Sequence, residues 1–197
     1  MTVSTFEIAS AADDGCGYKV GGGYPPTGGY VVLDGTAQYA WKGTSEVDCC
    51  YFRFDTSSIP DGDTITAATL RLYVTGLGAN PDGRNLIGDW YDFGGEPSVE
   101  ADWAATVGTD AVPGTALSAF TLAEWEEIAL SDPDGNINKA GYTGIRLGIS
   151  GGAGSGDNYA AFAAYEYDTA FSAELVVTHA AAGGGEGAKT MLLLGVG

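Results

Sequence analysis

Apolar and polar residues alternate along two segments of the sequence, 49–56 and 66–76. In the second segment an apolar residue recurs at every other position from Ala68 to Val74. Successive side chains of a β-strand point to opposite faces, so this period of two indicates strands with one buried face. A chain built on such segments must pair them into a sheet.

Other short β-rich runs lie at residues 5–11, 29–35, 36–43, 85–93, 145–150, 159–168 and 173–179. Glycine makes up 32 of the 197 residues, about twice its usual share, which is typical of many tight turns. Only 121–130 has a helical pattern, with Thr121 and Glu124 in capping-box spacing. Strands and helices do not alternate as they would around a parallel sheet. The prediction is an all-β domain over residues 1–179: an antiparallel two-sheet β-sandwich, or jelly roll, with one short helix.

A different composition begins after the last predicted strand. Residues 180–189 form a Gly-rich linker, and 190–197 are abruptly apolar. Two interpretations compete: an extended arm that adds a strand to a neighbouring protein or subunit, or an edge strand that folds back on its own domain. We favour the arm, because an isolated apolar end exposes hydrophobic surface. Its assembly residues are Met191, Leu192, Leu193, Leu194 and Val196.

Charge and motifs exclude several functions. The formal net charge of −18 argues against nucleic-acid binding and against docking on anionic lipid. No stretch reaches the roughly 20 apolar residues that span a bilayer, so we expect no membrane partner. The motifs GxSxG, HExxH and the P-loop are absent. His179 is the only histidine available to a catalytic triad, and its place at the end of an apolar strand favours a structural role. We expect no enzymatic activity.

Three cysteines, Cys16, Cys49 and Cys50, are too few and too unevenly spaced for a disulfide framework or a zinc site. Buried free thiols are the favoured interpretation. A single bridge from Cys16 to Cys49 or to Cys50 stays open as the alternative.

Aromatic residues are the best binding candidates, because flat apolar rings can stack on the C–H faces of sugars. The alternative is that these rings pack in the core or anchor loops. The glycan-binding candidates are Tyr39, Trp41, Trp90, Tyr91 and Trp103.

Residues 132–138 hold oxygen-bearing side chains at alternate positions, like the start of a Ca²⁺ loop. The candidate ligands are Asp132, Asp134, Asn136 and Asn138. The glycine is misplaced for an EF-hand, and Thr143 stands where a glutamate is needed. A plain Asp-Gly turn is favoured, and no cofactor is expected.

The segment CCYFRFDTSSIPDGDTITAATLRLYVTG (49–76) resembles the core of DNRLRE-type domains, which are similar to jelly-roll carbohydrate-binding modules. The segments 141–150 and 172–179 resemble the closing strands of the same unit, although the family's Arg and Pro are missing from the second. The resemblance covers about residues 5–179. It implies a non-catalytic sandwich that in some members binds glycans, and such domains also occur in viral structural proteins.

The residues after Met1 contain no basic and apolar segments typical of a secretion signal. Together with the acidic surface and the apolar arm, this favours a structural protein of a virus particle, such as a bacteriophage capsid decoration protein or a head or tail fibre component. The expected partners are a major capsid or tail protein, or further copies of the chain as a homo-oligomer. The alternative is a carbohydrate-binding module of a secreted or cell-surface protein.

Overall fold

The computed structural model describes residues 1–182 except 23, 34, 96–97 and 106–108. The first six strands are β1 (Thr2–Glu7), β2 (Asp14–Val20), β3 (Tyr30–Leu33), β4 (Ala37–Lys42), β5 (Glu46–Asp55) and β6 (Asp63–Leu77). The other six are β7 (Asn85–Trp90), β8 (Asp110–Ala116), β9 (Trp125–Ala129), β10 (Tyr142–Ile149), β11 (Asn158–Ala163) and β12 (Glu174–Ala181). The helical elements are α1 (Glu100–Ala104), α2 (Pro133–Asn136) and the 3-10 turns η1 (Leu117–Ala119) and η2 (Thr169–Phe171).

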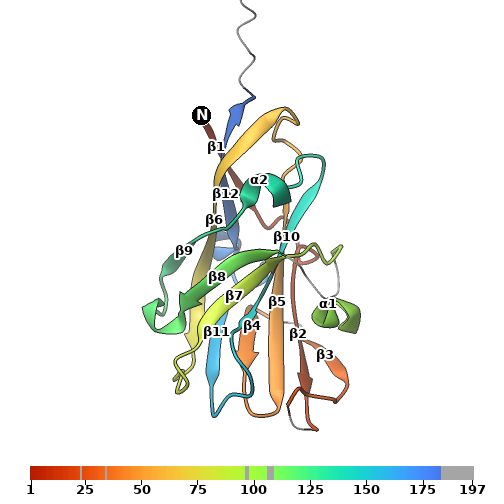
Figure 1. Cartoon of the computed structure of the whole chain (residues 1–197), viewed down its shortest axis with the longest axis vertical. Helices are drawn as coiled ribbons and strands as arrows, with labels where there is room; N and C mark the ends of the chain where they lie inside the picture. Colours follow the sequence, from red (N-terminus) through yellow and green to blue (C-terminus); the bar gives the residue numbers. More distant parts are fainter. Residues whose placement is uncertain (23, 34, 96–97, 106–108, 183–197) are drawn as a thin grey trace, which may run out of the picture.

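All the strand pairs are antiparallel, and they form one curled sheet that folds into two layers (Figure 1). The first layer contains β1, β12, β6 and β9, with β11 and β4 beside the far end of β6. The second layer has the order β3, β2, β5, β10, β7, β8. The predicted antiparallel β-sandwich of the jelly-roll class is therefore confirmed.

The core lies between the two layers. Leu70, Leu72 and Leu175 of the first layer belong to the same buried cluster as Phe52 and Leu147 of the second. The alternation along residues 49–56 and 66–76 is the cause, because it directs one face of β5 and one face of β6 inward.

The helix predicted over residues 121–130 is wrong. Residues 125–129 form strand β9, which pairs with β6 from Tyr73 to Thr69. The capping box does not form, since the carboxylate of Glu126 accepts the backbone N–H of Thr121. Pairing with an open edge of β6 buries Ile128 in the core, and this outweighs a helical propensity confined to ten residues.

Helices occur instead at α1 and α2, both in regions expected to be loops. Strands β2 and β8 were also missed. Each contains two residues that propensity disfavours in strands, Gly15 and Gly17 in β2 and Pro113 and Gly114 in β8. The predicted arm, with Met191, Leu192, Leu193, Leu194 and Val196, lies outside the described residues, so its role stays a prediction.

Candidate functional site

Five neighbouring strands in the lower half of Figure 1, in the order β11, β4, β5, β2, β3, share one row of side chains. Tyr159 is the register partner of Trp41, which pairs with Asp48. Asp48 in turn pairs with Tyr18 on β2. Directly paired residues lie on the same face of a sheet, so residues far apart in sequence are brought together here.

The row opens onto a cavity of about 250 Å³ that we call the aromatic cleft. It is lined by Tyr18, Leu33, Tyr39, Trp41, Glu46 and Asp48. Trp41 stacks on Tyr159, with ring centroids 5.1 Å apart and planes at 21°, and Tyr39 lies 6.1 Å from the same ring. The cleft therefore has aromatic walls, and the ring of Tyr159 packs against two of them.

Asp48 is the buried carboxyl of the aromatic cleft. The residue is 2% exposed, and its Oδ1 has no hydrogen-bond partner among the described residues. Burial, together with the negative charge of the neighbouring Glu46, raises the pKa of Asp48 to about 8. An unpaired carboxyl in such a place destabilises the free protein and is typical of a site that expects a ligand donor.

A side pocket of about 150 Å³ adjoins the cleft through Trp41 and Glu46. The turn 43–45, Gly156 and Asp157 supply its other walls. The two cavities together surround the edge of Trp41 with backbone, hydroxyl and carboxylate groups. This combination of ring faces and hydrogen-bonding groups suits a polyhydroxylated ligand.

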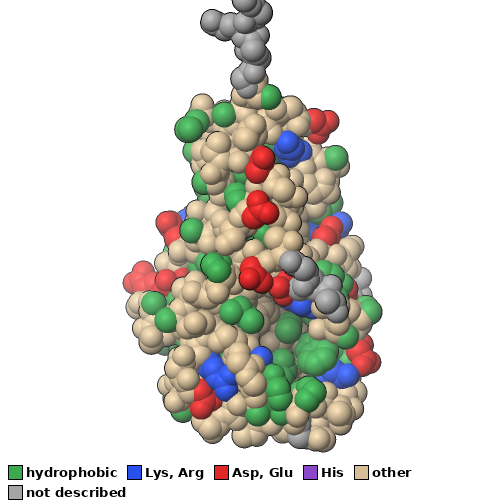
Figure 2. Space-filling model, in the orientation of Figure 1, with side chains coloured by type: hydrophobic (Ala, Val, Ile, Leu, Met, Phe, Trp, Pro, Cys, Tyr) green, Lys and Arg blue, Asp and Glu red, His purple; other side chains and the backbone are tan. Residues whose placement is uncertain are grey.

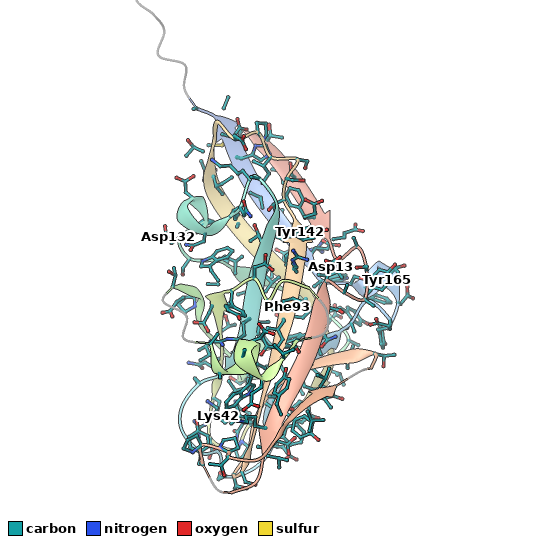
Figure 3. The ribbon with its side chains drawn as sticks, turned by 90° about the vertical axis from the view of Figure 1, so that its right-hand side faces the viewer. Asp13, Lys42, Phe93, Asp132, Tyr142 and Tyr165 are labelled. Carbon is teal, nitrogen blue, oxygen red and sulfur yellow. The ribbon has the colours of Figure 1, made fainter. Side chains whose placement is uncertain are left out.

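The opposite face of the same strands carries a cavity of about 190 Å³, which we call the α1 pocket. It is lined by Lys42, Val47, Cys49, Ile87, Asp89, Trp103, Arg146, Leu147, Gly148 and Ile149. Figure 2 looks onto this face, where hydrophobic side chains gather in a hollow near α1, and Figure 3 shows Lys42 at the lower end of the molecule.

Arg146 ties α1 to the sheet at the α1 pocket. Its Nη1 donates to the carbonyl oxygens of Asp102 (2.9 Å), Trp103 (3.3 Å) and Ala105 (2.9 Å), and its Nη2 lies 3.0 Å from the Asp89 carboxylate. Both terminal nitrogens of the guanidinium therefore already bind acceptors of the protein itself. We call this contact a structural joint, because it attaches α1 to the sheet.

Of the five aromatic residues predicted to bind glycans, two line the aromatic cleft, one lines the α1 pocket and two line neither cavity. Tyr39 and Trp41 line the aromatic cleft, whereas Trp103 lines the α1 pocket and donates its Nε1–H to the Val47 carbonyl. Trp90 packs against the core and donates to the Ser131 carbonyl, and Tyr91 donates to the Asp102 carboxylate.

Sequence reasoning missed Tyr18 and Tyr159 as members of the site. Both alternate with their neighbours along a strand, but only the register of β2 and β11 brings them to Trp41.

The predicted calcium loop folds into α2 and its flanks, in the upper half of the molecule and far from Lys42 (Figure 3). Asp134 accepts the Ile65 backbone N–H, and Asn136 donates to the Asp132 carbonyl. Asn138 accepts from the Ala140 backbone N–H. In the described part of the chain, no three His, Cys, Asp or Glu side chains are grouped so as to hold a metal ion. Calcium binding here stays a prediction.

His179 joins three strands in a chain of hydrogen bonds that the sequence did not predict. Its Nε2 lies 3.0 Å from the Ser4 hydroxyl and its Nδ1 lies 2.6 Å from the Asp63 carboxylate. The histidine is 4% exposed, and none of the three cavities above borders it. We interpret this Ser–His–Asp chain as a tie between β1, β12 and β6, in line with the structural role expected for His179.

The three cysteines are free thiols, as predicted. Cys16 and Cys50 are register partners on the buried face, whereas Cys49 belongs to the opposite face. Burial raises the pKa of each thiol, which keeps all three in the protonated, unreactive form.

Comparisons with known proteins leave the family open. No family model and no curated protein sequence matches the chain, so membership of the DNRLRE-type family stays a prediction. One solved structure that the chain matches is a xylan-binding module of the CBM15 family. The two are 15% identical, the match covers 90% of this chain and 97% of that chain, and the TM-score is 0.41. That likeness is too low to bear on the ligand.

Within the described residues, no helix has the length and apolar character needed to cross a membrane.

Proposed function

We propose that the chain is a non-catalytic binding module that takes a glycan in the aromatic cleft. The observation that carries the proposal is the row of register partners in which Trp41 stacks on Tyr159 beside the cavity. Sugar rings have apolar C–H faces and a rim of hydroxyls, and the cleft offers aromatic faces next to carboxylate and hydroxyl groups. In the α1 pocket, by contrast, Trp103 and Arg146 already have partners within the protein.

The test is a titration of oligosaccharides followed by calorimetry and by tryptophan fluorescence, on the wild type and on Trp41→Ala. Loss of one stacking ring removes about 2 kcal/mol of binding free energy, so we expect the affinity to fall about 30-fold. Trp103→Ala is the matched control: it removes a tryptophan from the α1 pocket and should leave the affinity unchanged. The proposal fails if no oligosaccharide of a broad panel binds, or if Trp103→Ala weakens binding while Trp41→Ala does not.

The role in a virus particle was predicted from the lack of a secretion signal, from the acidic surface and from the arm at 190–197. Those residues lie outside the described part of the chain, so capsid decoration stays a prediction. Deletion of 183–197 is expected to leave the domain folded and to disrupt attachment or oligomerisation. Unchanged assembly in light scattering would contradict it. Localisation outside the cell or at its surface, where glycans are abundant, accords with the glycan-binding proposal.

A further inference from the structure

The ionisable groups that line the aromatic cleft and its side pocket carry one sign of charge. Glu46 and Asp48 line the cleft, and Glu46 and Asp157 line the side pocket. Neither set of lining residues includes a lysine or arginine. Because like charges repel, a glycan rich in carboxylate or sulfate groups is disfavoured here, and a positively charged one is attracted.

Asp48 gives a second and independent indication. The side chain forms the floor of the cleft between Tyr18 and Trp41, and the residue is 2% exposed. Its Oδ1 accepts no hydrogen bond from the described residues. In the free protein, burial favours the protonated carboxyl. An ammonium group offers three donors with a compensating charge, so its arrival would stabilise Asp48 as a carboxylate and satisfy the buried oxygen.

The walls favour the same ligand. Tyr18, Tyr39 and Trp41 surround the cleft, and the face of an aromatic ring attracts a cation within about 6 Å of its centre. A neutral sugar would use the rings and could donate a hydroxyl O–H to Asp48, but it brings no charge to the buried carboxyl. A sugar with an ammonium group would supply the donor and the compensating charge together.

We infer that the cleft is selective for cationic glycans, those whose sugars carry free amino groups. The inference rests on the proposed function, because it names the substrate class of the same cleft. The ammonium lies against the Asp48 and Glu46 carboxylates, the proton of Asp48 leaves to solvent on binding, and the sugar ring stacks on Trp41.

The test compares two tetrasaccharides that differ only in charge. One is the glucosamine tetramer, which is protonated at pH 5.5, and the other is the N-acetylglucosamine tetramer, which is neutral. Neutral tetramers of xylose and of glucose extend the panel, and a tetralysine peptide controls for general attraction to a chain of net charge −18. In calorimetry at 0.15 M salt, we expect the glucosamine tetramer to bind at least about 10-fold more tightly than every other probe.

Variants locate the effect. Asp48→Asn keeps the shape of the side chain and removes the group that ionises beside the ammonium, and we expect it to abolish the 10-fold preference for the amino sugar while the N-acetylated tetramer binds as before. Glu46→Gln, on the more accessible rim, should reduce the preference and serves as the second variant if Asp48→Asn fails to fold. Asp89→Asn, which removes a carboxylate from the α1 pocket, is the matched control and should change neither affinity.

The outcomes are distinguishable. If neutral tetramers bind as tightly as the glucosamine tetramer, the cationic selectivity is overturned and the glycan-binding proposal stands. If tetralysine binds as tightly as the glucosamine tetramer, the attraction is general and the selectivity is again overturned. If no saccharide binds, the proposed function itself fails.

Discussion

The aromatic cleft and the α1 pocket lie on opposite faces of the same two strands, and they differ in charge. Trp41 pairs with Asp48 on the cleft side, whereas the next pair, Lys42 with Val47, belongs to the α1 pocket. Neighbouring residue pairs on β4 and β5 therefore place a carboxyl, Asp48, on one face of the sheet and a cation, Lys42, on the other. A shift of one strand by one residue would turn its side chains to the opposite face, so the register of β4 with β5 determines that Trp41 and Asp48 share a face.

The two regions differ even more in how their buried polar groups are satisfied. Arg146 in the α1 pocket has acceptors on three backbone carbonyls and a carboxylate. Asp48 in the cleft has a buried oxygen with no donor among the described residues. The first arrangement stabilises the fold, and the second weakens it. The polar groups of the α1 face are therefore satisfied within the protein, whereas the cleft keeps a buried carboxyl for the ligand that we propose.

The largest expected effect is on the stability of the α1 face. Arg146→Met keeps the length of the side chain but removes the donor of the Trp103 and Ala105 carbonyls and of the Asp89 carboxylate, and leaves the Asp102 carbonyl with only the 3.4 Å bond from the Ala105 N–H. We expect the free energy of unfolding to fall by about 3 kcal/mol in urea denaturation, with the affinity of the folded variant for glycans unchanged.

Lys19→Met is the control for that variant. Lys19 lies on the same face and forms an ion pair of 2.7 Å with Glu100, but the glutamate is largely exposed. Exposed pairs contribute less than about 1 kcal/mol, so its loss should be small. An equally small loss for Arg146→Met would show that the α1 pocket is not the structural joint we describe.

The next largest effect is on the free energy of unfolding, which the buried carboxyl of the cleft makes dependent on pH. In the folded state the pKa of Asp48 is raised from 3.8 to about 8, so between these values the folded chain holds a proton that the unfolded chain releases. This contribution to stability is present in full below about pH 4 and is lost as the pH rises toward 8. Asp14, whose pKa burial raises to about 7, acts in the same direction. We therefore expect the wild type to be less stable at pH 8.5 than at pH 5.

Asp48→Asn removes the larger of these two contributions. At pH 8.5 we expect the variant to be more stable than the wild type by about 2 kcal/mol, because a buried charge is replaced by a neutral amide. At pH 4.5 the carboxyl is protonated in the folded state, so the two proteins should unfold at nearly the same urea concentration. A variant that is less stable than the wild type at pH 8.5 would mean that Asp48 has a partner and that the contrast with Arg146 is mistaken.

The sequence predicted those features of the fold that follow from the pattern of neighbouring residues within one strand. The period of two in β5 and β6 was enough to place Phe52 and Leu70 in the core, and it led to the sandwich. Ring chemistry alone selected Tyr39 and Trp41. The segment 125–129 was assigned wrongly because its strand state comes from pairing with β6, which lies more than 50 residues away in sequence.

The chemistry of the cleft could not be predicted in the same way. Asp48 differs from the other acidic residues in its position between Tyr18 and Trp41, and two strand registers, of β2 with β5 and of β4 with β5, create that position. The Ser4 and Asp63 partners of His179 come from β1 and β6, so they too are products of long-range pairing. Sequence therefore indicates which residues can bind, whereas the register decides which of them meet.

The smallest effect tests whether the α1 pocket is dispensable for binding. Gly148 lines that pocket, and a Cβ added there would lie 3.7 Å from the Cys49 Sγ, which is an ordinary contact. Gly148→Ala should raise the free energy of unfolding by about 0.5 kcal/mol, because glycine in a strand interior loses more conformational entropy on folding than alanine does. It narrows the α1 pocket and leaves the cleft untouched, so glycan affinity should stay within the error of calorimetry. A marked loss of affinity in this stable variant would show that the glycan binds in the α1 pocket and not in the aromatic cleft. The unpaired carboxyl of the cleft would then need another explanation.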